Sequence, residues 1–327
     1  MLARDANNLF WLNRYLQRVE ITARLIRAHT NLLMDLPDAD PAVSWSTLLS
    51  ITGGNEEFAK LETDSNENSI CQFLISDSGN AGSMANNLEA IKTILRLSRN
   101  CMSPDLYELI KILCSYAENF SEQTQDISVR QGMLEKIEYQ SLTINGAISS
   151  TMSRDAGYLF LRAGHHLERA DMALRILDVQ STSLLLIDYK SELPPNDSIL
   201  WRYVLNTFSA FQIYMKQVRK PVAGPDVLSF LLKDQFFPFA MKYCLTELAH
   251  CIRLIGPGHD ESSYKTNGKT KGFIPELEEI IATIDQTDIA VIAKDKQQLH
   301  EFIDQIRSAI AQIYSDIESR YFPVKTT

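Results

Sequence analysis

The chain of 327 residues has little of what disulfide-stapled or sheet-rich proteins depend on. It has 13 glycines and five cysteines, and no two cysteines are spaced as in a CxxC motif. Disulfide frameworks and cysteine-based zinc sites are therefore not expected, and we expect reduced thiols. No segment alternates apolar and polar residues as a half-buried strand would.

Long apolar runs and an excess of basic charge are also missing. No stretch approaches the about 18 apolar residues of a membrane span, and Arg4, Asp5 and Asn7 stand where a signal peptide needs an apolar core. The net charge is -9, which disfavours nucleic acid and anionic membranes because both carry negative charge. We therefore expect a cytoplasmic protein that binds neither nucleic acid nor membrane.

Motifs for cofactors and metals are absent as well. The sequence has neither a GxxxxGK[ST] loop nor a GxGxxG loop for nucleotides. His165-His166 with Glu168 suggests a metal site, but helical dimetal sites need Glu-x-x-His on two helices, and the order here is reversed. The acidic segment 35–40 resembles a magnesium motif, but Pro37 would break the helix that aligns its carboxylates. We therefore predict no metal and no cofactor.

What the chain does contain is a repeated amphipathic helix over residues 2–34 and 152–185. A shift of 151 residues, which takes Leu9 to Phe160, aligns the two apolar stripes without a gap. Their steps of three and four residues are those of a helix packed along its length against other helices. The first stripe is Leu9, Leu12, Leu16, Val19, Ala23, Ile26, Thr30 and Leu33, and the second is Phe160, Ala163, Leu167, Ala170, Leu174, Leu177, Ser181 and Leu184.

The repeat predicts an all-α protein, a helical bundle with long central helices and an internal pseudo-twofold duplication. At 1.5 Å per residue each repeated helix would be about 45 Å long, which suits a bundle. No flexible linker separates the repeats, about 1–140 and 150–322, so we predict one domain over 1–327. Further helices are predicted over 67–77, 81–100, 105–132, 201–218, 225–233, 239–254, 275–284 and 293–321.

Charged residues recur on the two copies together with the apolar stripe. A second match, at a shift of 150 residues, pairs Ala3-Arg4-Asp5-Ala6 with Ser153-Arg154-Asp155-Ala156, where Asp5 or Ser153 could cap the first turn. The candidate ligand- or partner-binding residues are Arg14, Arg18, Glu20 and Arg24 in the first copy and Arg154, Asp155, His165, Glu168, Arg169, Asp171 and Arg175 in the second.

Arg18 and Arg169 occupy equivalent positions between two apolar stripes. Each guanidinium would be partly desolvated there and would need a carboxylate or phosphate partner. If the two copies face each other, reciprocal Arg–carboxylate pairs would give the motif a structural role. An open cleft would instead favour binding of an anionic ligand or peptide, and catalysis is the third alternative. Only the second copy has Glu168 and the histidine pair, so a site would be asymmetric and centred on the second helix.

Three stretches of the chain resemble the uncharacterised bacterial alpha-E domain family. They are ARDANNLFWLNRYLQRVEITARLI at 3–26, STMSRDAGYLFLRAGHHLERADMALRILDV at 150–179 and FLLKDQFFPFAMKYCLTEL at 230–248. The chain departs from the family pattern at Gln17, where the family favours Glu, and at His165-His166, where Arg-Tyr is usual. The Glu-Arg pair that gives the family its motif is therefore complete only at Glu168-Arg169.

The resemblance implies an all-α protein of unknown activity that accompanies, or is fused to, a circularly permuted ATP-grasp protein. Transglutaminase-like proteases and a proteasome-like peptidase are frequent neighbours, which implies a system that makes or attaches small peptides. Our leading hypothesis is a non-catalytic partner that docks the ATP-grasp ligase or holds an anionic peptide substrate. The alternatives are an enzyme that acts on peptides or amino acids with Glu168 as acid/base, and a purely structural homo-oligomer.

Overall fold

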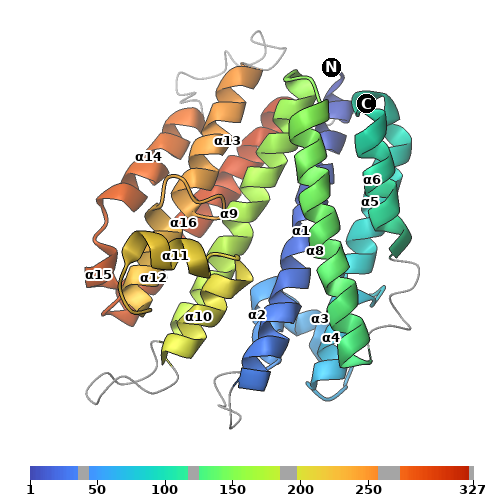
Figure 1. The fold of residues 1–327 in the computed structure, drawn as a ribbon. Coiled ribbons are helices and arrows are strands. Elements are labelled where there is room, and N and C mark those ends of the chain that lie inside the picture. Colours follow the sequence, from blue (N-terminus) through green and yellow to red (C-terminus); the bar gives the residue numbers. More distant parts are fainter. Residues whose placement is uncertain (36–43, 117–124, 185–196, 257–272, 324–327) are drawn as a thin grey trace.

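The computed structural model describes residues 1–35, 44–116, 125–184, 197–256 and 273–323 of the chain. Every regular element within these ranges is helical, so the predicted all-α fold class is confirmed. The two repeated segments form α1 (Ala3–Asp35) and α9 (Ala156–Leu184), which lie side by side in the middle of the bundle (Figure 1). α1 runs for 33 residues and contains neither glycine nor proline, the two residues that most disfavour a helix interior.

The apolar stripes predicted from the repeat lie in the buried core of the bundle. Every stripe side chain that the structure describes is buried, except Leu33, which is partly buried. Gly164 marks a point of close approach between the helices, because a Cβ on this residue would stand only 2.1 Å from the backbone oxygen of Phe10. At Gly164 the α1–α9 packing therefore accepts only glycine without a shift of the backbone.

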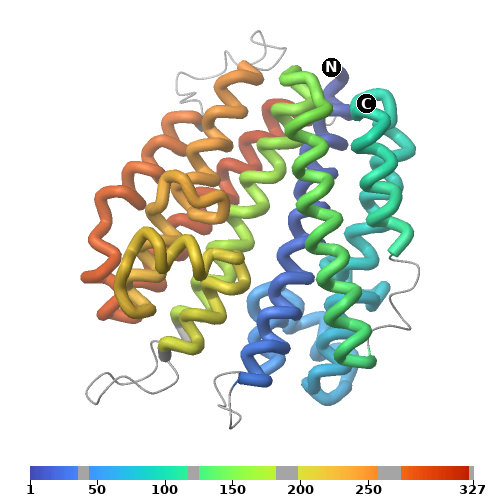
Figure 2. Tube along the Cα trace, viewed as in Figure 1, coloured from blue at the N-terminus to red at the C-terminus, as the bar shows by residue number. Residues whose placement is uncertain are grey.

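A group of three helices from its own half of the chain lies beside each central helix. In both halves two of these helices pack on the central one, and the third packs on both of those two. Figure 2 shows the two groups on opposite sides of the α1–α9 pair. The first group is α5 (Met84–Leu97), α6 (Pro104–Tyr116) and α8 (Ile127–Thr151), and the second is α13 (Met241–Ile255), α14 (Phe273–Gln286) and α16 (Lys296–Tyr321).

In each half a shorter helix packs on the central helix of the other half. α2 (Ser46–Thr52) of the first half packs on α9, and α10 (Asp197–Thr207) of the second half packs on α1. This exchange is the pattern that a pseudo-twofold duplication predicts, and the duplication of the whole halves stays a prediction. The remaining short elements are α3 (Asn55–Ala59), α4 (Glu67–Ile75), the 3-10 turn Arg99–Cys101, α11 (Phe211–Val218), α12 (Gly224–Lys233) and α15 (Ile289–Ile292).

Two of the predicted helices are divided in the structure. The helix expected over 105–132 is wrong, because α6 and α8 are separate helices that pack against each other. The helix expected over 201–218 ends at Thr207 and begins again at Phe211, and Ser209 between them has a φ of 53°. The left-handed backbone at Ser209 cannot belong to a right-handed helix, and it turns α11 away from α10.

The buried apolar residues of both halves form one continuous cluster. All five cysteines are free thiols, and four of them are buried. Within the described ranges, no helix has the length and apolar character needed to cross a membrane.

Candidate functional site

Glu168 is the centre of a charged network between α1 and α9. Its side chain is 0% exposed, and Arg14 Nε donates to its Oε2 at 2.6 Å. Arg18 donates through Nε to Oε1 and through Nη2 to Oε2, the latter at 3.4 Å. Burial alone would raise the pKa of Glu168, but the two guanidinium groups outweigh it and hold this pKa below its ordinary value. Glu168 is therefore an ionised carboxylate whose two oxygens are both occupied.

Arg169 is the second residue of the Glu-Arg pair. It donates from α9 to α1, whereas Arg18 donates from α1 to α9. Arg169 Nε donates to Gln17 Oε1 at 2.7 Å, and its Nη2 lies 3.9 Å from Glu20 Oε2. Gln17 Nε2 also donates to Glu20, at 3.1 Å. The shift of 151 residues takes Gln17 to Glu168 and Arg18 to Arg169. The Arg18–Glu168 and Arg169–Gln17 contacts are therefore one contact made twice, with an amide in place of one carboxylate.

Aromatic rings hold two of these guanidinium groups in place. The guanidinium of Arg14 lies 4.6 Å from the ring centres of both Trp11 and Tyr314, and that of Arg169 lies 3.9 Å from the ring centre of Phe239. Such cation–π contacts contribute about 0.5–2 kcal/mol each, more where water is excluded. The rings also restrict the rotamers of both arginines, so the network is rigid as well as paired.

The network is closed at its Glu20 end. Arg24 Nε donates to Glu20 Oε1 at 3.1 Å, and its Nη1 donates to Ser209 Oγ at 2.6 Å. Arg24 also lies 3.8 Å from Glu138 of α8. Glu20 is 0% and Arg24 7% exposed, so neither can reach a ligand without displacing a partner.

The equivalent pair on α9, Asp171 with Arg175, is the more open end. Arg175 Nε donates to Asp171 Oδ2 at 3.1 Å, and their side chains are 40% and 17% exposed. Burial raises the pKa of Asp171 against the opposing effect of Arg175. Arg18 stands at the same edge, with 30% of its side chain exposed. Burial would lower its pKa, but the Glu168 carboxylate outweighs this effect and raises it. The network therefore reaches solvent at Arg18 and Arg175.

The histidine pair is buried against the same helices. His165 and His166 are 2% and 1% exposed, and burial, together with nearby arginines, holds both pKa values well below the ordinary range. Arg162 Nη2 lies 2.9 Å from His166 Nε2, which accepts because the ring is neutral. No group of three or more potential metal ligands occurs in the described part of the chain. Of the acidic segment 35–40, only Asp35 lies among the described residues.

Arg154 and Asp155 lie apart from this network, at the start of α9. Asp155 Oδ1 accepts a hydrogen bond from the backbone N of Tyr158 at 3.1 Å, which caps the helix. Arg154 Nη2 donates to the Ser149 carbonyl at 2.8 Å, and its guanidinium lies 4.2 Å from the Tyr158 ring centre. The cap is therefore Asp155 rather than Ser153, and Asp5 lies inside α1 rather than ahead of it.

Several residues of the network escaped the sequence analysis because they come from distant segments. Ser209 follows a helix end that the sequence did not reveal, and Tyr314 lies on the last helix, α16. Phe239 lies in the stretch 230–248, which resembles the family but carries no charge pattern that points to Arg169. The carbonyl of its neighbour Pro238 accepts a hydrogen bond from Arg169 Nη1 at 3.4 Å.

Comparison with known families finds a family model that matches nearly the whole chain. The model of a predicted α-helical domain with a conserved ER motif, named Alpha-E, matches residues 1–322. The chain belongs to the Alpha-E family. In this Alpha-E protein the Glu-Arg sequence is Glu168-Arg169, and both residues lie in the network between α1 and α9.

The relatives of this Alpha-E protein are longer than the chain itself. It is similar to uncharacterised proteins of Mycobacterium bovis and Mycobacterium tuberculosis, with 22% identity over 277 residues in each case. The match covers 80% of this chain but 30% of each relative. The region shared with these proteins is thus less than a third of their length. No solved structure matches the chain.

Proposed function

We propose that this Alpha-E protein is a non-catalytic helical partner of a circularly permuted ATP-grasp amide or peptide ligase. It docks the ligase or holds an anionic peptide substrate for it. A transglutaminase-like protease is a second partner in this proposal. In this proposal the two proteins act together in the bacterial cytoplasm, where ATP is available to the ligase.

The observation that carries the proposal is that both oxygens of the buried Glu168 carboxylate are already paired with arginines. A general acid or base has to reach the proton that it transfers and needs a pKa near the working pH. Glu168 is buried, its two oxygens accept from Arg14 and Arg18, and its pKa is lowered. These properties suit a structural ion pair that fixes α1 against α9, and they disfavour the acid/base role of the enzyme alternative.

The lengths of the relatives also support a partner protein. Because the shared region is 30% of each mycobacterial relative, this type of domain also occurs within longer chains. A domain that works with a partner protein is expected to be joined to other domains in some chains. The net charge of -9 agrees with a protein partner rather than a nucleic acid.

Mixing the purified chain with the circularly permuted ATP-grasp protein of the same genome tests the proposal. Size-exclusion chromatography with light scattering is expected to show a complex, and ligase turnover is expected to change when the Alpha-E protein is added. An unrelated ATP-grasp ligase serves as the control and should elute separately. Separate elution of the cognate pair, with unchanged turnover, contradicts the proposal.

The two alternatives give different results in the same experiments. A structural homo-oligomer would give a mass above that of one chain when the protein is measured alone. An enzyme using Glu168 would lose turnover in Glu168→Gln without a change in melting temperature, whereas the proposal expects that variant to lose stability.

A further inference from the structure

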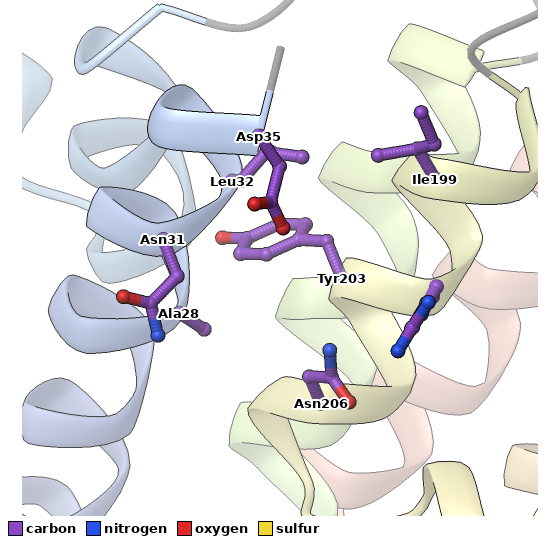
Figure 3. Close-up of a pocket in the computed structure, with 8 residues that line it drawn as sticks. Ala28, Asn31, Leu32, Asp35, Ile199, Tyr203 and Asn206 are labelled. Atoms are coloured by element: carbon purple, nitrogen blue, oxygen red, sulfur yellow. The ribbon is translucent and has the colours of Figure 1, made fainter.

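A second polar site lies away from the Glu168 network, where the end of α1 meets α10. A cavity of about 400 Å³ opens there between the two helices. Figure 3 shows Asp35 and Asn31 on the α1 side and Tyr203 and Asn206 on the α10 side. Arg202 of α10 completes the polar lining. The cavity therefore offers a carboxylate, a guanidinium and two amides within one small space, beside the side chain of Tyr203.

The two charged groups of this cavity have no ion-pair partner among the described residues. Arg202 instead lies with its guanidinium 4.5 Å from the ring centre of Phe211, a contact that orients the group and leaves its N–H edges available. Asp35 is the last residue of α1, where the helix dipole already places partial negative charge. A carboxylate at a helix C-terminus gains from a bound cation, and none of the described side chains supplies one.

Tyr203 is an unsatisfied polar group in the wall of the same cavity. The residue is 4% exposed, and its hydroxyl oxygen has no hydrogen-bond partner within the described ranges. Burial raises the pKa of this hydroxyl. The nearby Thr207 hydroxyl donates instead to the backbone carbonyl oxygen of Tyr203, at 3.1 Å. A buried hydroxyl without a partner costs about 1–3 kcal/mol. The oxygen itself is not exposed, so a ligand can pair with it only after a shift of the Tyr203 side chain.

The chemistry of the lining excludes most ligand classes. A phosphate dianion would meet one guanidinium but also the Asp35 carboxylate, and a metal ion would find only that one carboxylate among the charged groups. An apolar ligand would leave both charges unsatisfied. What remains is a small dipolar ligand with a carboxylate for Arg202, an ammonium for Asp35, and amide groups between them for Asn31 and Asn206.

We infer that this cavity binds a short peptide with free ends, its carboxylate on Arg202 and its ammonium group on Asp35. Its volume equals that of about a dozen liquid water molecules, at roughly 30 Å³ each, which suits two or three small residues. The apolar side chains of Leu32 and Ile199 border the space and provide contact for small side chains. The inference does not need the ligase partnership, because the peptide alone occupies the site.

Isothermal titration calorimetry with trialanine tests the inference through a set of blocked ligands. Trialanine with free ends is expected to bind, and blocking either end, as N-acetyl-trialanine or trialanine amide, is expected to weaken binding at least about tenfold, the equivalent of one charge-assisted contact. Equal binding of all three peptides, or no binding of trialanine at several millimolar, overturns the inference.

Variants of the two charged residues assign each end of the peptide. Arg202→Gln is expected to bind trialanine about tenfold more weakly and to bind the free and amidated peptides equally. Asp35→Asn is expected to bind the free and the acetylated peptides with equal affinity. Arg99→Gln is the matched control, because Arg99 is also exposed and stacked on an aromatic ring, that of Tyr107, and it should bind as the unmodified chain does. Unchanged discrimination in Arg202→Gln and Asp35→Asn contradicts the assignment, and the absence of ligase from the assay keeps this outcome separate from that of the proposed partnership.

Discussion

The two polar regions on α1 differ in whether their charged groups are buried and paired. Along the middle of the helix, Arg14 and Arg18 share the buried carboxylate of Glu168. At its C-terminal end, Asp35 faces the cavity that Arg202 also lines, and neither has an ion-pair partner among the described residues. Charges that are buried and paired fix the position of one helix against another, whereas exposed charges without a partner are free to bind. The difference assigns architecture to the first region and ligand binding to the second.

Removing the central carboxylate should have the largest effect on stability. Glu168→Ala leaves Arg14 buried without its partner, and breaking a buried ion pair from one side costs about 3–5 kcal/mol. Chemical denaturation should show this loss. Glu278→Ala is the control, because Glu278 and its partner Arg253 are both largely exposed and such pairs contribute about 0–1 kcal/mol. Equal losses in the two variants would remove the distinction between the regions.

The pH dependence of stability probes His29, which lies on α1 between the two regions. Burial lowers the pKa of His29 to about 4, whereas the unfolded chain binds this proton near pH 6.5. Between these values the unfolded state holds more protons, so stability falls as pH decreases from about 6.5 to about 4, by up to about 3 kcal/mol. His29→Phe keeps a ring beside Trp45 and Tyr203 but cannot titrate. Urea denaturation across this pH range should give a shallower slope for the variant, and an unchanged slope would contradict the burial of His29.

Close packing of the central helices should make Gly164 sensitive to a single methyl group. Gly164→Ala would bring a Cβ to 2.1 Å from the Phe10 backbone oxygen, and overpacking of this kind costs about 1–3 kcal/mol. Gly146→Ala in α8 is the matched control, since a Cβ there would meet nothing within 4 Å. The control should gain up to about 1 kcal/mol from better helix propensity. Melting temperatures that move in the same direction for both variants would show that α1 and α9 do not approach as described.

The cavity residues should have the smallest effect on stability. Asp35→Asn and Arg202→Gln remove exposed charges that have no ion-pair partner, so each is expected to change the unfolding free energy by no more than about 0.5 kcal/mol. Thermal denaturation without peptide measures this. A loss comparable to that of Glu168→Ala would mean that these charges also serve the fold.

How much of this could be predicted from the sequence differs between the fold and the site. The apolar stripes from Leu9 and from Phe160 predicted the two central helices, because helical periodicity depends only on residues close in the chain. The same reasoning missed the break at Ser209, since a left-handed residue other than glycine leaves no clear mark in the sequence. The cavity was missed for a related reason, as Asp35 and Arg202 meet only after α10 has packed on α1.

The network itself was predicted in part. The equivalence of Arg18 and Arg169 followed from the repeat, and reciprocal contacts were one of the alternatives left open. The partners could not be assigned, because Arg14 and Arg18 converge on Glu168 while Arg169 takes the neutral Gln17. The sequence also centred the site on the second helix, whereas five of the polar network residues, Arg14, Gln17, Arg18, Glu20 and Arg24, lie on α1.

A double-mutant cycle between Arg14 and Glu168 tests most directly whether the Glu-Arg motif is architectural. Arg14→Met, Glu168→Leu and the double variant are compared by urea denaturation of the otherwise unchanged chain. A buried ion pair predicts two destabilised single variants, a coupling energy of about 2–3 kcal/mol, and a double variant no less stable than either single one. Additive losses, with a coupling energy below about 0.5 kcal/mol, would contradict the structural role of the motif.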